Sequence, residues 1–206
     1  MPVIVVANPK GGVGKSTLAT NLAGFLVRLG HAVMLGVADR QQSARLWLGL
    51  RPTHLPVIAG WELDADRLAK PPRGTTHVVL DTPAGLHGKK LDEVMKIADR
   101  VLLPLQPSIF DIYATRDFLD ALLARRKSER VDVAVVGNRV REGTIAAEQL
   151  AAFLAKLGVP VLGHLRDTQN YIHLAARGLT LWDVAPSRVE KDLEQWAPLT
   201  RWALAS

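Results

Sequence analysis

The sequence predicts a doubly wound α/β fold, in which a mainly parallel sheet carries helices on both of its faces. Short runs of Val, Ile and Leu alternate along the chain with longer helical patterns, and runs that are apolar throughout are typical of strands buried on both sides. A glycine-rich loop joins the first run to the first helical pattern. With 206 residues, of which 48% are hydrophobic, the chain has the size of a single domain, which we expect to span residues 1–206.

The first elements follow from these patterns in order. A β-branched run predicts the first strand at residues 3–7. Apolar residues at helical spacing then predict a helix over residues 18–29, with Gly30 as its C-cap. A second buried strand is expected at residues 32–37, because this run is again apolar.

Residues 51–76 contain four prolines, which favour a loop-rich connection around one short helix at residues 64–68. Beyond this connection, apolar runs and helical patterns alternate regularly. The expected strands are residues 77–80, 101–105, 131–136 and 160–165. The expected helices are residues 86–98, 112–127 and 145–157. A sheet of this kind binds its ligands at the carboxyl ends of the strands, so we expect the functional site at that edge.

The composition excludes several classes of site. The chain has no cysteine, which rules out disulfides, thiolate nucleophiles, cysteine zinc sites and cysteine-ligated iron–sulfur clusters. No apolar run approaches the ~18–20 residues that span a bilayer, and the first strand begins without a charged leader or cleavage site, so we expect a cytoplasmic protein. The net charge of +6 suits simple solubility, or attraction to nucleic acid or to an anionic membrane.

A phosphate-binding loop occupies residues 9–17, which read Pro-Lys-Gly-Gly-Val-Gly-Lys-Ser-Thr. Its glycines allow backbone N–H groups to surround phosphates, and the following helix presents its positive end. Lys15 is expected to reach the β- and γ-phosphates, while the hydroxyl of Ser16 binds Mg²⁺. A tight turn without a ligand is the alternative, but the strand–loop–helix setting favours a nucleotide. The candidate nucleotide-binding residues of this loop are Lys10, Gly11, Gly12, Val13, Gly14, Lys15, Ser16 and Thr17.

An acidic residue, Asp81, ends the strand expected at residues 77–80 and is followed by Thr-Pro-Ala-Gly85. An aspartate at a strand end is often a turn or helix-cap residue. Beside a phosphate-binding strand it is better interpreted as a carboxylate that holds Mg²⁺ through water. Gly85 would allow this loop to approach the γ-phosphate and to move after hydrolysis.

The chain resembles the ParA/MinD family of deviant Walker ATPases, in particular the short ParA partition ATPases. The resemblance rests on residues 10–17, on the Ala-Asp-Arg-Gln-Gln-Ser stretch at 38–43, on residues 81–85 and on Asn138-Arg139, which occur in the family's order. Nothing precedes the first strand, so we expect no separate helix-turn-helix domain that reads an operator. The protein would then leave specific recognition to a partner.

The resemblance implies a homodimer that forms when ATP is bound, with ATP and Mg²⁺ as cofactors. Lys10 would reach across this dimer to the partner's nucleotide and act like an arginine finger supplied in trans. Dimerisation would thereby complete a catalytic group of Lys10, Lys15 and Asp39. Within this group, Asp39 would orient the attacking water.

The resemblance also implies contacts with the base. Asn138 would read the adenine edge, and the stretch at residues 165–167 would close the base pocket. The candidate residues are Asn138, Arg139, Arg166 and Asp167. The chain departs from the family at Val37, where a first aspartate is usual, and at Arg40, where a proline is usual. Losing that carboxylate should weaken water-mediated Mg²⁺ contacts or slow turnover.

The ATP-bound dimer is expected to bind DNA non-specifically and to release it when an adaptor protein stimulates hydrolysis, so that a cargo is positioned over the nucleoid. Such contacts with phosphates are independent of sequence and strongly salt-dependent. The candidate DNA-binding residues are Arg125, Arg126, Lys127, Arg130, Arg188 and Lys191. The first three could instead form a solvated helix end that complements the helix dipole. The sequence leaves the cargo open between a plasmid, a chromosome and a protein cluster.

Two other functions stay open at this point. A MinD-like ATPase would bind membrane through a C-terminal amphipathic helix, and residues 188–206 contain Trp196 and Trp202. Acidic residues offset the basic ones there and Pro198 interrupts the helix, so membrane binding is disfavoured and we expect the tryptophans to pack against the domain. A metabolic P-loop enzyme, such as a dethiobiotin-synthetase-like ligase, would need a substrate pocket, which residues 51–76 could form.

Overall fold

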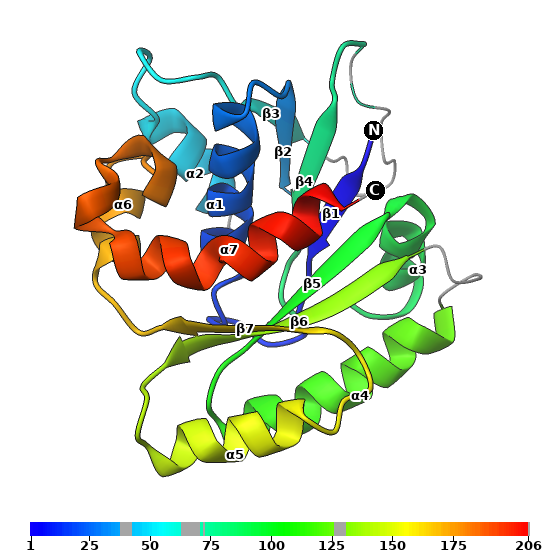
Figure 1. The fold of residues 1–206 in the computed structure, drawn as a ribbon. Helices are drawn as coiled ribbons and strands as arrows, with labels where there is room; N and C mark the ends of the chain where they lie inside the picture. The colour runs from blue at the N-terminus through cyan, green and yellow to red at the C-terminus, as the bar shows by residue number, and fades with distance from the viewer. Residues whose placement is uncertain (38–42, 63–70, 72, 126–130, 206) are drawn as a thin grey trace.

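A seven-stranded parallel sheet forms the centre of the molecule (Figure 1). The computed structural model describes residues 1–37, 43–62, 71, 73–125 and 131–205. The strands are β1 (Val3–Val6), β2 (Val33–Val37), β3 (Ala59–Glu62), β4 (His77–Asp81), β5 (Arg100–Leu105), β6 (Asp132–Val140) and β7 (Val161–Arg166). Their order across the sheet is β3-β2-β4-β1-β5-β6-β7, and every neighbouring pair is parallel. The doubly wound α/β fold expected from the sequence is confirmed.

Helices cover both faces of this sheet (Figure 1). One face carries α1 (Lys15–Arg28), α2 (Ser43–Leu50), α6 (Asn170–Ala175) and α7 (Glu190–Leu204). The other face carries α3 (Gly88–Ile97), α4 (Ile109–Arg125) and α5 (Ile145–Leu154). Two short 3₁₀ helices, η2 (Leu181–Asp183) and η3 (Pro186–Arg188), connect α6 to α7.

Alternate residues of the central strand supply two hydrophobic cores, one on each face. In β1, Val3 and Val5 pack with the core under α3, α4 and α5, whereas Ile4 and Val6 pack with the core under α1, α2 and α7. All four side chains are buried, which explains why this strand is apolar throughout instead of alternating. Burial on both sides holds β1 in the middle of the sheet, and the glycine-rich loop therefore starts at the centre of the carboxyl edge.

The C-terminal helix corrects one expectation, because Pro198 lies inside α7 and does not interrupt it. A proline removes one backbone hydrogen bond from a helix. Trp196, Leu199 and Ala203 are buried in the core under α1, and this packing outweighs the missing bond. Trp196 also donates through Nε1 to the Tyr171 hydroxyl at 2.9 Å. The expectation that Trp196 packs against the domain is confirmed.

The connection at residues 51–76 contains a strand, β3, that the sequence analysis missed. It lies at the edge of the described sheet beside β2, and its sequence Ala-Gly-Trp-Glu lacks the β-branched residues that mark the other strands. The short helix expected at residues 64–68 lies outside the described residues. Of the helices in the described part of the chain, none is long and apolar enough to cross a membrane.

Candidate nucleotide-binding site

The glycine-rich loop joins β1 to α1 and turns tightly at two glycines. Gly12 and Gly14 have φ angles of 76° and 95°, in the left-handed region that favours glycine. A Cβ atom at Gly14 would clash with Asn138 Nδ2, so a side chain there would also force Asn138 to move. Gly14 is also the N-cap of α1, which brings the positive end of that helix to the loop.

A cavity of about 600 Å³ opens over this loop. The loop and the start of α1 form part of its wall, and the segment after β4 and the start of α3 form another part. The described lining residues are Gly11, Gly12, Gly14, Lys15, Ser16, Thr17, Ser43, Pro83, Ala84, Gly85, Leu86, Lys90 and Arg139. Three of these side chains are cationic and none of them is a carboxylate, so this lining suits an anion.

The two lysines of the loop have different surroundings. Lys15 is buried and lines the cavity, and its Nζ donates to the backbone oxygen of Lys10 at 2.6 Å. The backbone N–H of Lys10 donates to Asn8 Oδ1 at 2.8 Å. The Lys10 side chain is half-buried and is not among the described lining residues. Of the two lysines of this loop, Lys15 is therefore the one that lines the cavity.

Asp81 ends β4 next to the loop, where its register partners are Val6 in β1 and Val37 in β2. It is fully buried and is not among the described lining residues of the cavity, and its role in holding a metal through water stays a prediction. Across the described residues, no group of three His, Cys, Asp or Glu side chains could hold a metal.

Two polar residues that the sequence analysis missed hold the loop in place. Asn8 donates through Nδ2 to Pro104 O at 2.8 Å and to Thr115 Oγ1 at 3.1 Å. Gln106, just after β5, donates through Nε2 to Gly12 O at 3.0 Å. The sequence offered one signal for Asn8: it is a polar residue directly between an apolar strand and a glycine-rich loop. Gln106 had no such signal, because its partner is distant in the sequence.

Asn138 and Arg139 lie near the end of β6, beside the same loop. Asn138 is buried, and its Nδ2 donates to Val13 O at 2.8 Å. Arg139 lines the cavity and has a φ of 54°, the one positive value among the described residues other than glycine. That Asn138 reads the adenine edge stays a prediction.

Arg166 and Asp167 end and follow β7, outside the described lining of the cavity. Arg166 donates through Nε and Nη2 to the buried Asp192 of α7, at 2.6 and 3.2 Å. Asn170 also donates through Nδ2 to Asp192, at 2.6 Å. The hydrogen bonds with Asp192 raise the pKa of the Arg166 guanidinium. Asp167 pairs with Arg141 at 2.7 Å. Contact of Arg166 or Asp167 with a base stays a prediction. Arg166 would make this contact with the guanidinium N–H groups that do not bind Asp192.

The basic candidate residues lie at opposite edges of the sheet. Arg125 ends α4 just before β6, at the amino edge of the strands, and pairs with Asp92 at 2.6 Å. Arg188 and Lys191 are exposed near the start of α7, close to the carboxyl end of β7. The structure therefore does not bring these two groups together. Four further candidate residues lie outside the described part of the chain: Asp39, Arg126, Lys127 and Arg130.

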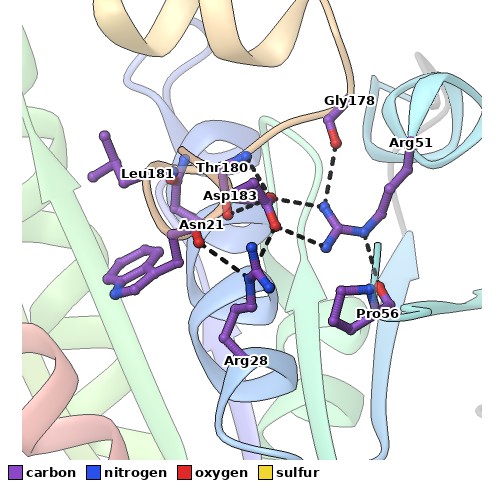
Figure 2. A network of polar contacts seen from close by, with 9 residues as sticks. Asn21, Arg28, Arg51, Pro56, Gly178, Thr180, Leu181 and Asp183 are labelled. Atoms are coloured by element: carbon purple, nitrogen blue, oxygen red, sulfur yellow. Dashed lines mark hydrogen bonds and ion pairs between the residues drawn. The ribbon is translucent and has the colours of Figure 1, made fainter. Parts of the chain in front are cut away.

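A buried carboxylate, Asp183, joins α1 and α2 to the segment before α7 (Figure 2). Arg51, which directly follows α2, donates to the two Asp183 oxygens at 2.9 and 3.3 Å. Thr180 donates to Asp183 at 2.8 Å from its backbone and at 2.7 Å from its hydroxyl, and Arg28 of α1 lies within 3.4 Å. Burial acts to raise the pKa of Asp183, but the hydrogen bonds from Arg51 and Thr180 outweigh it and lower the pKa.

Both helices that end at this network begin at the cavity. The first residues of α1 and α2 are Lys15 and Ser43, and both line the cavity. A further contact joins α1 to the same segment, because the Leu181 N–H donates to Asn21 Oδ1 at 3.0 Å (Figure 2). Asn21 Nδ2 in turn donates to Thr17 O at 2.8 Å. The far ends of two helices that form the site are thus held by one polar network.

The chain matches known proteins over most of its length. A family model described as the CobQ/CobB/MinD/ParA nucleotide binding domain matches residues 4–181. A maintenance of carboxysome distribution protein A from Gloeobacter kilaueensis is 32% identical over 184 residues, which cover 87% of this chain and 83% of the relative. A protein of the same name from Halothiobacillus neapolitanus is 28% identical over 190 residues, 88% of this chain and 87% of the relative.

A solved structure has the same fold. The septum site-determining protein MinD from Pyrococcus horikoshii OT3, complexed with Mg-ADP, has a TM-score of 0.73 and 17% sequence identity with this chain. The matched region covers 98% of this chain and 96% of that one. At this level of identity the likeness concerns the fold.

Proposed function

Because the chain belongs to the CobQ/CobB/MinD/ParA family of nucleotide-binding domains, we propose that it is a Mg²⁺-dependent ATPase whose ATP-bound form is a homodimer. This dimer binds DNA non-specifically and positions a cargo over the nucleoid. An adaptor protein ends the bound state by stimulating hydrolysis. The observation that carries the proposal is the cavity over the glycine-rich loop, whose described lining is cationic and includes Lys15, Ser16 and Thr17.

In this proposal the glycine-rich loop binds the phosphates. Backbone N–H groups at the start of α1 and the ammonium group of Lys15 hold phosphate oxygens. Ser16 holds Mg²⁺ through its hydroxyl, and Asp81 holds it through water. When bound, Mg²⁺ neutralises charge on the β- and γ-phosphates. The Mg-ADP complex of the Pyrococcus MinD structure supports this choice of ligands.

Asp39 and Lys10 act on hydrolysis in the same proposal. Asp39 orients a water for attack on the γ-phosphorus, where a new P–O bond forms while the bond to the bridging oxygen breaks. The products are ADP and inorganic phosphate. Lys10 of the second subunit stabilises the charge that develops on the transferred group. Val37 replaces an aspartate near the metal, and we expect turnover to be slow for this reason.

The named relatives support cargo positioning as the purpose of the cycle. Two of them carry a name that refers to the distribution of carboxysomes. Each of these two relatives matches more than four fifths of this chain. We therefore propose a protein cluster as the first cargo to test, ahead of a plasmid or a chromosome. The adaptor that links the cargo to the dimer would also stimulate hydrolysis.

DNA is the proposed surface for this cycle, and a membrane is the alternative. Arg188 and Lys191 are exposed close to the carboxyl edge of the sheet, where nucleotide binds in this proposal. Trp196, which could have served a membrane helix, is fully buried. An interfacial helix needs its aromatic face free to enter the lipid.

The deciding experiment measures retention of the chain on non-specific DNA with ATP and with ADP across a salt series. Anionic vesicles are tested in parallel, and Lys15→Ala serves as the variant that cannot bind nucleotide. We expect retention with ATP alone, and we expect it to fall steeply with salt because counterions are released on binding.

Other outcomes identify the alternatives. Retention that is indifferent to nucleotide would contradict the DNA cycle, and binding to vesicles alone would favour a MinD-like membrane ATPase. Turnover that depends on a small metabolite and not on DNA would favour the dethiobiotin-synthetase-like ligase.

A further inference from the structure

Lys90 is a cation of the cavity that the sequence analysis did not single out. It lies in the first turn of α3 and contributes to the wall together with residues 83–86. We propose that Lys90 binds the terminal phosphate of a nucleoside triphosphate and makes the site favour the triphosphate over the diphosphate. This inference rests on the proposed nucleotide-binding function of the cavity.

The packing of α3 brings Lys90 to the cavity. Leu91, Val94 and Met95 form the buried stripe of this helix. Successive residues of a helix are about 100° apart, so Lys90 lies at the border of the stripe and Lys89 on the opposite side. Accordingly, Lys90 lines the cavity, while its neighbour of the same type is not among the described lining residues.

The start of α3 is an unfavourable place for lysine unless an anion lies nearby. The first turn of a helix carries partial positive charge, which disfavours cations. Even so, α3 has Lys89 and Lys90 in its first turn and no acidic residue there. Within the described part of the chain, no carboxylate forms an ion pair with Lys90. Helix stability therefore does not account for Lys90, whereas a phosphate would complement both the lysine and the helix end.

The segment that leads into α3 is fastened to the glycine-rich loop. The Gly85 N–H donates to Pro9 O at 2.8 Å, and Thr82 Oγ1 donates to Val6 O at 2.9 Å. Gly85 and Gly88 have φ angles of 72° and 55°, which only glycine adopts readily. These contacts keep the start of α3 at the cavity, so that Lys90 and the loop act on one ligand.

The segment of the wall that carries Lys90 suggests which phosphate this lysine binds. In sites of this kind, the glycine-rich loop surrounds the inner phosphates, and bound Mg²⁺ would neutralise charge on the outer ones. Lys90 shares the wall formed by residues 83–86, the segment that follows Asp81, which holds Mg²⁺ in the proposed function. We therefore assign Lys90 to the outer phosphate. Hydrolysis removes that phosphate, so the contact with Lys90 exists in the triphosphate state alone. Lys15, by contrast, serves both states.

The test compares Lys90→Gln with Lys89→Gln in the full chain. Affinities for a fluorescent ADP and for a fluorescent non-hydrolysable ATP analogue are measured with Mg²⁺ at fixed ionic strength. Both lysines are exposed in the first turn of α3, so either change should raise the unfolding midpoint slightly and by a similar amount. We expect Lys90→Gln to weaken the ATP analogue about ten-fold and ADP less than two-fold, the scale of one charge-assisted hydrogen bond. Lys90→Arg should keep most of the preference, and Lys89→Gln should change neither affinity.

Two results would overturn the inference: equal weakening of both nucleotides by Lys90→Gln, or equal effects of the Lys89 and Lys90 variants. Either would reduce the role of Lys90 to general surface charge while nucleotide binding itself stands. A failure of the proposed function is recognised separately. In that case the parent chain binds neither nucleotide, or Lys15→Ala binds both normally, and the inference falls with it.

Discussion

Gly14 shows how much a single residue of the glycine-rich loop is constrained. Its φ of 95° favours glycine, and this constraint belongs to the motif itself. A second constraint comes from Asn138, whose side chain lies against Gly14 and donates to Val13, 125 positions earlier. Gly12 has the first constraint without the second, since no described atom lies within 4 Å of a Cβ built there. The two glycines therefore form a matched pair.

We expect Gly14→Ala to lower the free energy of unfolding by about 1–3 kcal/mol more than Gly12→Ala, because it adds a clash to the backbone strain. Urea unfolding of the two variants measures the difference. Nucleotide titration should show a larger loss for Gly14→Ala as well. Equal losses of stability would mean that Asn138 moves away freely and does not brace the loop.

Replacing each of the two lysines of the loop should have a different effect. Lys15→Ala is expected to abolish nucleotide binding, because Lys15 lines the cavity. Lys10→Ala should leave ATP binding largely intact and remove dimerisation and stimulated turnover. Nucleotide titration, light scattering and phosphate release separate these effects. A Lys10→Ala chain that dimerises and hydrolyses ATP normally would contradict the proposed role of Lys10 in trans.

At the scale of elements, α1 and α2 are held at their far ends by the Asp183 network. The Asp183 side chain is completely buried and that of Arg51 is 5% exposed, whereas that of Arg28 is 39% exposed. An exposed ion pair contributes little, while a buried carboxylate that loses its partner is costly. The network therefore depends mainly on Arg51.

We expect Arg51→Met to lower the free energy of unfolding by about 3–5 kcal/mol and Arg28→Met by less than about 1 kcal/mol. Chemical denaturation at neutral pH measures both. Because α2 starts at the cavity, Arg51→Met should also weaken nucleotide binding. Similar stabilities for the two variants would show that Asp183 does not rely on Arg51.

The same network predicts a dependence of stability on pH. Since the pKa of Asp183 is lowered in the folded chain, its carboxylate stabilises the fold above the ordinary value of 3.8. This stabilisation is lost as the pH falls through the lower, folded-state pKa. Asp183→Asn should be less stable than the parent at neutral pH and should lose less stability below about pH 4. Unfolding midpoints across the acid range test this, and parallel acid profiles of the two chains would contradict it.

At the scale of the whole molecule, the fold separates basic residues that the sequence groups as one candidate surface. Arg125 lies at the amino edge of the sheet in an ion pair, while Arg188 and Lys191 lie near the carboxyl edge. Arg201, near the other end of α7, is also exposed and is suited as a control. A DNA surface that responds to nucleotide should lie on the side of the cavity.

We expect the Arg188→Gln and Lys191→Gln double variant to weaken ATP-dependent retention on DNA. It should also make the slope of the logarithm of affinity against the logarithm of salt concentration shallower by roughly 3–4, because a dimer would lose two phosphate contacts per subunit at ~0.9 each. Arg201→Gln should leave both unchanged. Affinities measured over a salt series test this prediction. An unchanged slope in the double variant would place the DNA surface elsewhere.

The sequence predicted most of the elements because their signals are local. The parallel strands were visible as apolar runs, and the loop after β1 as a glycine motif between a strand and a helix. Strand β3 was missed, since Ala-Gly-Trp-Glu has no strand pattern of its own and pairs only because β2 provides an edge. The prediction at Pro198 was wrong because local propensity yields to the buried contacts of Trp196 and Leu199.

The sequence by itself determined the fold class, the phosphate loop and the family, since these depend on periodicity and on short motifs. The tertiary structure decided which distant residues share the cavity. It places Lys90 and Arg139 in the same cavity lining as the loop. It also pairs Arg166 with Asp192, and it pairs Asp183 with Arg28 of α1 and with Arg51 after α2. These pairings depend on the order of the strands in the sheet and on the need to pair buried charges. No local stretch of the sequence indicates the strand order or the partner of a buried charge.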